Sequence, residues 1–266
     1  DADQGKEPLG LATLIAERRL TVWYSTPTIL TVLAEFGKLE LHDLSALRYV
    51  LFAGEVFPPK HLRAVKARVP HARSFNLYGP TETNVCTWHP IPDVVEEGRA
   101  EPYPIGRTCS HFRSRVVDES GRDVERGAEG ELVIHGDGML QGYFNNPERT
   151  AAAFLVGADG RRWYQTGDRV VEDADHVLTF VGRRDRMVKR RGYRIELGEI
   201  EAGLYRHQEV KEAAVVARKD AEGGVRITAC LALEPGRRGS EIQMRAFCAK
   251  ALPGYMMPDA FRFLDV

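Results

Sequence analysis

The sequence has few cysteines and no long apolar run. Only four cysteines occur among its 266 residues, and Cys86, Cys109, Cys230 and Cys248 lie far apart. This spacing indicates neither a disulfide framework nor a Cys-x-x-Cys metal site, and it fits a reducing compartment. No stretch approaches the roughly 18 apolar residues that a membrane span needs, and the first residues lack the features of a signal peptide. We therefore expect a cytoplasmic protein without a membrane partner.

An excess of charge of either sign is also missing. The sequence balances 37 Lys and Arg against 38 Asp and Glu, which gives a formal net charge of -1. Such a chain has no long-range field to hold a polyanion, so we expect no nucleic-acid partner. The 43% hydrophobic and 28% charged residues are ordinary for a folded soluble protein and exclude disordered, collagen-like and coiled-coil classes.

The first part of the chain, residues 1–100, alternates helical and strand patterns. Thr26 and Pro27 are typical of a helix start, residues 48–53 form an apolar run, and residues 59–69 place apolar side chains at helical spacing. Further strands are expected at residues 21–24 and 74–78. Because alternating strands and helices are joined by crossovers, this pattern predicts an α/β subdomain with a parallel sheet.

Two further regions follow. Residues 101–184 contain short segments of alternating polar and apolar residues, which predict a small antiparallel sheet or β-barrel. Residues 185–266 combine a helix from Leu197, strands at 210–217 and 225–233, and a helix opened by Ser240 with the pattern of a capping box. The sequence thus predicts a large α/β core portion followed by a small α+β C-terminal lobe.

Four clusters of polar residues and glycines lie where predicted strands end. They are Asn76–Thr83, Tyr164–Asp168, Gly182–Glu201 and Leu252–Pro258. Each has an ordinary structural interpretation: a Gly-Pro turn, a capped hairpin, a solvated basic face and a helix stop. Seven of the thirteen residues from 182 to 194 are basic, but the balanced charge of the whole chain disfavours a nucleic-acid patch.

In this order and spacing, the clusters resemble the core motifs of the adenylate-forming superfamily, and specifically the amino-acid adenylation domains of nonribosomal peptide synthetases. The resemblance covers nearly the whole chain. It includes Asn76-x-Tyr78-Gly79-Pro80-Thr81-Glu82, Pro104 to Arg107, Gly130-Glu131-Leu132-x-Ile134-x-Gly136-x-Gly138, Gly142-Tyr143, Tyr164-x-Thr166-Gly167-Asp168, the Gly182–Glu201 run and the Leu252–Pro258 turn.

The resemblance implies a partial adenylate-forming fold and a two-step reaction. Such enzymes join a carboxylate to the α-phosphate of ATP, release pyrophosphate, and pass the acyl group to the phosphopantetheine thiol of a peptidyl carrier protein. ATP and Mg²⁺ are the implied cofactors. The implied ATP- and AMP-binding residues are Gly54, Glu55, Asn76, Tyr78, Gly79, Thr81, Asp168 and Arg183.

The resemblance also implies individual roles. Tyr78 would stack on adenine, with Asn76 and the backbone of Gly54 and Glu55 at the edge of the ring, and Asp168 would take the ribose hydroxyls with help from Arg183. The implied catalytic residues are Thr81 at the α-phosphate, Glu82 as the Mg²⁺ ligand, Asp185 as the hinge between the 1–184 core and the 185–266 lobe, and Lys189 beside the pantetheine arm.

The implied substrate pocket is apolar. Registering residues 21–28, 48–54 and 76–86 on the family pattern selects six residues that carry no charge, so an acidic or basic substrate would be buried without a partner. The set resembles that of free-standing prolyl-activating enzymes, and we expect L-proline as the substrate, although other small apolar amino acids fit the same lining. The six residues are Tyr24, Leu51, Ala53, Leu77, Val85 and Cys86.

Two family motifs are missing. The Gly/Ser/Thr-rich phosphate loop that ends in Lys-Gly has no counterpart here, nor has the second catalytic lysine expected beyond the Leu252–Pro258 turn. We therefore expect a piece of a longer enzyme that cannot run adenylation by itself. Two alternatives stay open: an acyl- or aryl-CoA ligase of the same superfamily, and a noncatalytic nucleotide-binding module.

Overall fold

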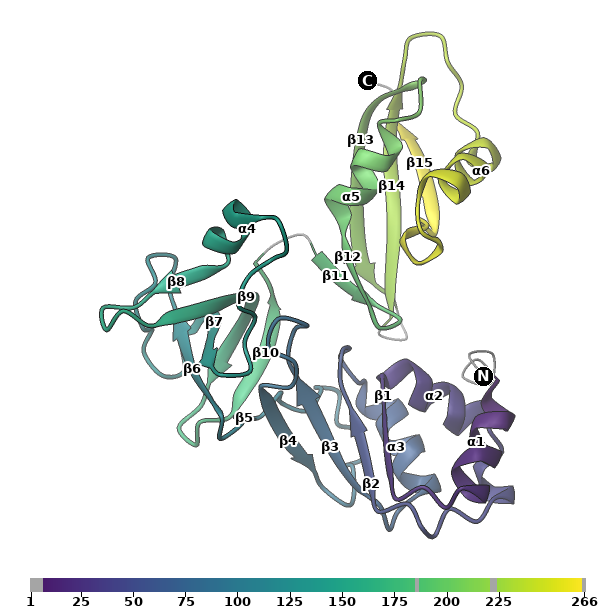
Figure 1. Cartoon of the computed structure of the whole chain (residues 1–266). Coiled ribbons are helices and arrows are strands. Elements are labelled where there is room, and N and C mark those ends of the chain that lie inside the picture. The colour runs from purple at the N-terminus through teal and green to yellow at the C-terminus, as the bar shows by residue number, and fades with distance from the viewer. Residues whose placement is uncertain (1–6, 185–186, 221–223, 265–266) are drawn as a thin grey trace. The chain divides into compact units, whose positions relative to one another are not determined.

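The computed structural model describes residues 7–184, 187–220 and 224–264. The chain divides into two compact units, Asp1–Arg184 and Asp185–Val266. Figure 1 shows the elements of each unit in chain order. Within the described residues, no helix is long and apolar enough to cross a membrane.

The first unit begins with a mixed five-stranded sheet in the order β1-β2-β3-β4-β5. Strands β1 to β3 are parallel, as the alternating pattern predicts, whereas β4 and β5 add on in antiparallel direction. The short loop between β3 and β4 holds no crossover helix, so the chain can only return antiparallel. The strands are β1 (Val22–Ser25), β2 (Tyr49–Phe52), β3 (Arg73–Tyr78), β4 (Thr87–Ile91) and β5 (Arg107–Thr108).

Three helices cover one face of this sheet: α1 (Pro8–Glu17), α2 (Pro27–Phe36) and α3 (Pro59–Arg68). Val50 and Phe52 of β2 belong to the same buried core as Leu30 of α2 and Leu62 of α3. Because successive strand residues point to opposite faces, the residues between them face away from the helices. Thr26 occupies the expected position before α2, but its side chain makes no capping hydrogen bond.

The second half of the first unit is an antiparallel sheet in the order β10-β9-β7-β6, with β8 added on β9. Strands β6 and β10 are not paired with each other, so the predicted barrel is not a closed one and the alternative of an antiparallel sheet is correct. The elements are β6 (Phe112–Val117), β7 (Glu129–Gly136), α4 (Pro147–Ala152), β8 (Phe154–Val156), β9 (Arg162–Glu172) and β10 (Leu178–Arg183).

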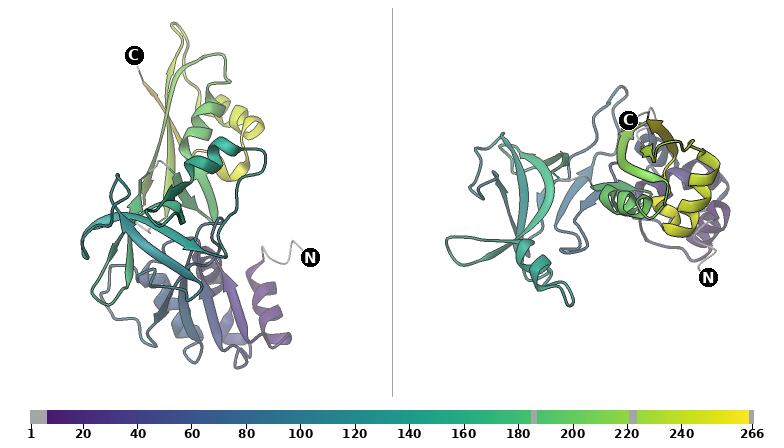
Figure 2. Two further views of the ribbon diagram at one scale, coloured as in Figure 1. Left: turned by 60° about the vertical axis from the view of Figure 1, so that its left-hand side comes forward. Right: turned by 90° about the horizontal axis from the view of Figure 1, so that it is seen from above.

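The second unit combines a hairpin with a three-stranded sheet in the order β13-β14-β15. Helices α5 and α6 share one buried core with this sheet, which includes Ile200, Leu231 and Cys248. Figure 2 shows the unit from two further directions. Its elements are β11 (Met187–Arg190), β12 (Tyr193–Glu196), α5 (Leu197–Leu204), β13 (Val210–Lys219), β14 (Val225–Leu233), α6 (Glu241–Ala251) and β15 (Ala260–Leu264).

Candidate active site

Asp168 is the centre of a buried polar cluster in the first unit. Its side chain is 0% exposed. The guanidinium of Arg183 donates from Nη1 to Asp168 Oδ1 at 2.8 Å, and the hydroxyl of Tyr78 donates to Asp168 Oδ2. A buried carboxylate without such partners would be strongly destabilising, so both donors hold the charge in place.

Strands β9 and β10 bring these residues together. Asp168 and Arg183 are direct partners in the antiparallel ladder, next to a register shift between Phe180 and Gly182. Gly167 has a φ of 72°, a left-handed conformation that glycine adopts without strain. The Tyr164–Asp168 motif was expected in a turn, but it lies inside β9, where this irregular backbone aims Asp168 at Tyr78.

Tyr78 ends β3 and is 5% exposed. Burial, followed by the negative charge of Asp168, raises the pKa of its hydroxyl well above the ordinary value. The hydroxyl therefore stays protonated and keeps donating to Asp168 at neutral pH. In this structure the ring belongs to the apolar core that also contains Cys86 and Val170.

Glu131 is a site residue that the sequence indicated only as part of the Gly130-Glu131-Leu132 motif. Its carboxylate is buried on β7 and accepts from the backbone N–H of Gly167 at 3.0 Å and from Arg184 Nη1 at 2.7 Å. The N–H of Arg184 in turn donates to the carbonyl of Gly167 at 2.8 Å. Glu131 thus fixes the backbone next to Asp168. In the sequence, an acidic residue within a strand and beside apolar residues could have indicated this role.

Glu82 lies in the loop between β3 and β4 and is half-buried. Tyr143 donates its hydroxyl to Glu82 Oε1 at 2.8 Å, and the N–H of Leu140 donates to the Glu82 carbonyl at 2.6 Å. Burial and the hydrogen bond to Glu82 raise the pKa of Tyr143. Tyr143 is a second site residue that the sequence indicated only as part of a motif.

The β3–β4 loop is tightly folded. The N–H of Cys86 donates to the carbonyl of Tyr78 at 2.8 Å, which closes the loop. A Cβ atom at Gly79 would lie 1.5 Å from the carbonyl oxygen of Asn84, so only glycine fits there. Thr81 is exposed at the tip of this loop.

The predicted adenine-edge residues lie at the carboxyl ends of neighbouring parallel strands. Gly54 follows β2 with a φ of 94°. Beside it, Glu55 Oε2 accepts from both the N–H and the hydroxyl of Thr28, at 3.0 and 2.6 Å. Asn76 in β3 donates from Nδ2 to the carbonyl of Pro104 at 2.8 Å. Ligands of open α/β sheets bind at this edge.

Four of the six predicted pocket residues lie on one side of the first sheet. Tyr24 and Leu51 are cross-strand partners. Leu77 of β3 and Ala53, which directly follows β2, continue the alternation that points to the same side as Leu51. This is the face away from the helices, and Tyr24 is 55% exposed there. In the β3–β4 loop, Val85 is half-buried, whereas Cys86 is fully buried and lines no described hollow.

Two of the predicted catalytic residues belong to the second unit. Lys189 lies on β11, opposite Arg194 of β12, and is half-buried. Asp185, the predicted hinge, lies outside the described residues.

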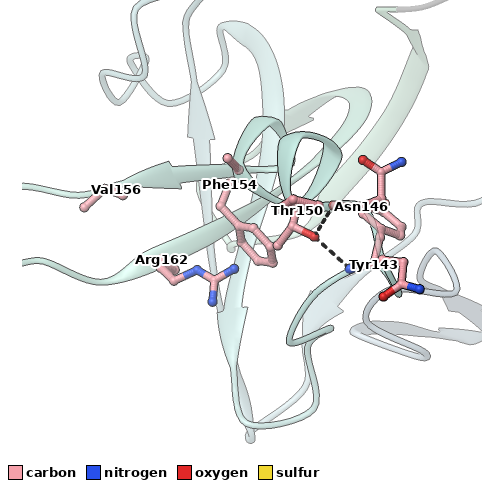
Figure 3. A pocket seen from close by; sticks show the side chains of 9 residues that line it. Tyr143, Asn146, Thr150, Phe154, Val156 and Arg162 are labelled. Atoms are coloured by element: carbon pink, nitrogen blue, oxygen red, sulfur yellow. Dashed lines mark hydrogen bonds between the residues drawn. The ribbon is translucent and has the colours of Figure 1, made fainter.

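An open groove lies apart from the predicted pocket residues. It is a groove of about 620 Å³ that includes none of the six predicted pocket residues (Figure 3). Tyr143, whose hydroxyl reaches Glu82, forms one of its walls. The groove is lined by Tyr143, Asn145, Asn146, Pro147, Thr150, Ala151, Phe154, Val156 and Arg162.

Across the described ranges, no three His, Cys, Asp or Glu side chains come together as a metal-binding group. Mg²⁺ keeps waters and binds through one or two carboxylates plus substrate phosphates, so it needs no such group. A single half-buried carboxylate held in place, as at Glu82, fits this mode of binding.

Comparison with known protein families gives two matches. The profile of AMP-binding enzymes matches residues 2–144, and that of the AMP-binding enzyme C-terminal domain matches residues 199–266. The chain belongs to the AMP-binding enzyme family, which consists of adenylate-forming ligases.

Two curated relatives indicate the branch of the family. The chain is 42% identical over 264 residues to L-proline--[L-prolyl-carrier protein] ligase of Streptomyces coelicolor, covering 98% of this chain and 48% of that protein. It is 37% identical over 263 residues to the dimodular nonribosomal peptide synthase of Bacillus subtilis, covering 98% of this chain and 11% of that protein. The chain thus spans about half the length of the Streptomyces ligase.

Solved structures agree with this assignment. The crystal structure of IdnL1 matches with a TM-score of 0.88 and 29% identity over 100% of this chain and 54% of that one. The structure of PA1221, a nonribosomal peptide synthetase protein with adenylation and carrier domains, matches with a TM-score of 0.77 and 29% identity over 98% of this chain and 51% of that one. The expected partial adenylate-forming fold is confirmed.

Proposed function

We propose that this chain forms the nucleotide-holding part of a ligase that activates an amino acid and loads it on a carrier protein. In the first step the amino-acid carboxylate attacks the α-phosphate of ATP, and the bond to pyrophosphate breaks. In the second step a phosphopantetheine thiol attacks the aminoacyl-AMP, so that a thioester forms and AMP leaves. The relatives that carry these activities in their names support both steps.

The buried Asp168–Arg183–Tyr78 cluster is the observation that carries the nucleotide site. Asp168 would accept the two ribose hydroxyls. Both of its oxygens already accept one hydrogen bond, but a carboxylate has about four acceptor positions, so two remain. Because Asp168 is 0% exposed, nucleotide binding would have to uncover these positions. Arg183 would hold the carboxylate in its orientation through the hydrogen bond to Oδ1.

The remaining nucleotide contacts follow from the strand ends. Asn76 and the backbone of Gly54 and Glu55 would meet the edge of adenine. Tyr78 is 5% exposed in this structure, so its ring would stack on adenine only after nucleotide binding uncovers one face. Gly79 lets the loop turn tightly before Thr81, whose exposed hydroxyl would contact the α-phosphate.

Mg²⁺ would be held by Glu82, whose carboxylate is of the hard-oxygen type that this cation prefers. When bound, the ion would neutralise charge on the phosphates of ATP. The Glu82 carboxylate would supply one oxygen ligand to the ion, and the hydrogen bond from Tyr143 would orient that carboxylate.

Carrier loading would depend on the second unit. Lys189, on the β11–β12 hairpin, would line the path of the pantetheine arm, and Asp185 would be the hinge on which the 185–266 lobe turns relative to the 1–184 core. The carrier protein and the amino acid are the proposed partners. The four free cysteines fit a cytoplasmic location.

L-proline is the proposed substrate. Tyr24, Leu51, Ala53 and Leu77 offer an apolar sheet face, and Val85 and Cys86 of the β3–β4 loop carry no charge either, so a charged side chain would find no partner among these six residues. The relative named as an L-proline ligase supports this choice. Neutral substrates that differ by one methylene are separated by only about 1–3 kcal/mol, so rejection of charged amino acids is the sharper expectation.

Amino-acid-dependent exchange of pyrophosphate into ATP tests the function, with a protein that has the full length of the Streptomyces relative. We expect exchange with L-proline and none with glutamate or lysine. Ala53→Phe should suppress proline exchange while ATP binding persists, because overpacking acts locally. Product formation that requires coenzyme A would favour an acyl-CoA ligase instead, and ATP binding without exchange would favour a noncatalytic module.

A further inference from the structure

Glu82 is tied to the segment after β7 by two hydrogen bonds. Tyr143 Oη donates to Glu82 Oε1 at 2.8 Å, and the N–H of Leu140 donates to the Glu82 carbonyl at 2.6 Å. Tyr143 lies 61 residues away from Glu82 along the chain. A part of the first unit that is distant along the chain therefore contacts both the carboxylate and the backbone of Glu82.

Tyr143 is itself held firmly. Its N–H donates to Thr150 Oγ1 at 2.9 Å, and Thr150 Oγ1 donates to the carbonyl of Asn146 at 2.8 Å, as Figure 3 shows. The guanidinium of Arg149 lies 4.6 Å from the centre of the Tyr143 ring. Helix α4 thus begins with a set of contacts that fix both the backbone and the ring of Tyr143.

We propose that Tyr143 is a positioning residue for Glu82, which fixes the carboxylate in the orientation that meets Mg²⁺ bound to the phosphates of ATP. A free glutamate side chain has several rotamers, and choosing one of them costs entropy. A hydrogen bond from a rigidly held hydroxyl to the carboxylate removes most of that cost before the metal arrives. This inference rests on the proposed function, since it assumes that Glu82 meets the metal.

The proposal predicts a selective effect. AMP binding without Mg²⁺ depends on the ribose and adenine contacts and should not depend on Tyr143. ATP binding in the presence of Mg²⁺ should depend on it, because Glu82 would contribute only there. Loss of a merely structural contact would weaken both nucleotides alike.

Tyr143→Phe tests the proposal, with nucleotide binding measured by calorimetry as Mg²⁺ is varied. The variant keeps the ring that packs under Arg149 and removes only the hydroxyl. We expect the Mg²⁺ concentration for half-maximal ATP binding to rise roughly tenfold, the usual effect of one hydrogen bond to a charged group, with AMP affinity within about twofold of wild type. Tyr205→Phe is the matched control. It also removes a tyrosine hydroxyl, but that hydroxyl is hydrogen-bonded to the backbone of Ala213 in the second unit and not to Glu82.

Thr150→Val provides an independent variant, because it removes the hydroxyl that holds the Tyr143 backbone and leaves Tyr143 and Glu82 unchanged. It should also raise the Mg²⁺ concentration for half-maximal ATP binding, by a smaller factor than Tyr143→Phe. If Tyr143→Phe proves to be strongly destabilised, the result with Thr150→Val decides whether Tyr143 positions Glu82. An unchanged Mg²⁺ dependence, or an equal loss for AMP and ATP, would overturn the role of Tyr143. Failure of the wild-type protein to bind AMP would instead overturn the nucleotide site, and this inference with it.

Discussion

At the scale of single residues, the site is built around charges that are buried and compensated. Asp168 and Arg183 are 15 residues apart, and the resemblance named both. The contact between Tyr78 and Asp168 joins residues 90 positions apart, and local patterns carry no information about such a pairing. The same holds for Glu131 on β7 and Arg184 directly after β10, which meet because β9 pairs with both strands.

Asp168→Asn should destabilise the protein strongly. The substitution keeps the size of the side chain but removes the buried carboxylate charge that faces the guanidinium of Arg183, which is 9% exposed. Breaking a buried pair in this way typically costs about 3–5 kcal/mol. Urea unfolding should reveal the loss, whereas Arg19→Gln should change stability by less than about 0.5 kcal/mol, because the Arg19–Asp43 pair is exposed. Equal effects of the two substitutions would show that Asp168 is not a buried ion-pair centre.

Cys86 should resist thiol reagents at neutral pH. The pKa of this thiol is raised to about 12, mainly by burial. The thiolate, which is the form that reacts, is therefore scarce at neutral pH. The unfolded chain releases the same proton near pH 9, so stability is fully present below that pH and is lost as pH rises towards 12. Mass spectrometry after iodoacetamide treatment should show labelling of the half-buried Cys109 and Cys230 before Cys86. Early labelling of Cys86 would contradict its burial.

At the scale of elements, sequence patterns predicted most helices and strands but not the direction in which every strand joins its sheet. The expected strands at 48–53 and 74–78 are present as β2 and β3, and the helix expected at 59–69 is α3. The antiparallel addition of β4 was missed because strand direction depends on the connection and not on the pattern within the strand. The glycine in the Tyr164–Asp168 motif predicted a turn, but the motif lies within β9. A glycine at an irregular position of a strand looks the same in the sequence as a glycine in a turn.

Gly79→Ala should disrupt the β3–β4 loop. The added methyl would overlap the Asn84 carbonyl, so the backbone that carries Thr81 and Glu82 must move. We expect a loss of about 1–3 kcal/mol in unfolding experiments, as for other overpacked sites. Gly198→Ala is the control, because its Cβ would meet nothing within 4 Å and alanine favours helix α5. A neutral Gly79→Ala variant would show that the loop is looser than described.

At the scale of the whole molecule, the chain is two compact units, of which the first carries all of the proposed nucleotide contacts. Four of the six predicted pocket residues lie on the sheet face that α1 to α3 leave uncovered within the described residues. The sequence identified these residues through the resemblance, but it could not indicate what lies opposite them, since relatives extend well beyond the matched region.

Asp185→Pro should separate the two proposed half-reactions in a protein of the relatives' full length. Proline fixes its own φ and restricts the residue before it, so rotation at this position would be limited. We expect pyrophosphate exchange to survive while loading of the carrier protein falls sharply, and Asp185→Ala should leave more loading intact. If both half-reactions are lost together in the proline variant, the hinge does not lie at Asp185.

Calorimetric titration of AMP and of 2′,3′-dideoxy-AMP into this chain tests the nucleotide site most directly. If Asp168 accepts the ribose hydroxyls, AMP should bind at least about tenfold more tightly than the dideoxy compound, as expected for hydrogen bonds to a charged acceptor. Binding of the two nucleotides with equal affinity, or binding of neither, would contradict the site built on Asp168, Arg183 and Tyr78.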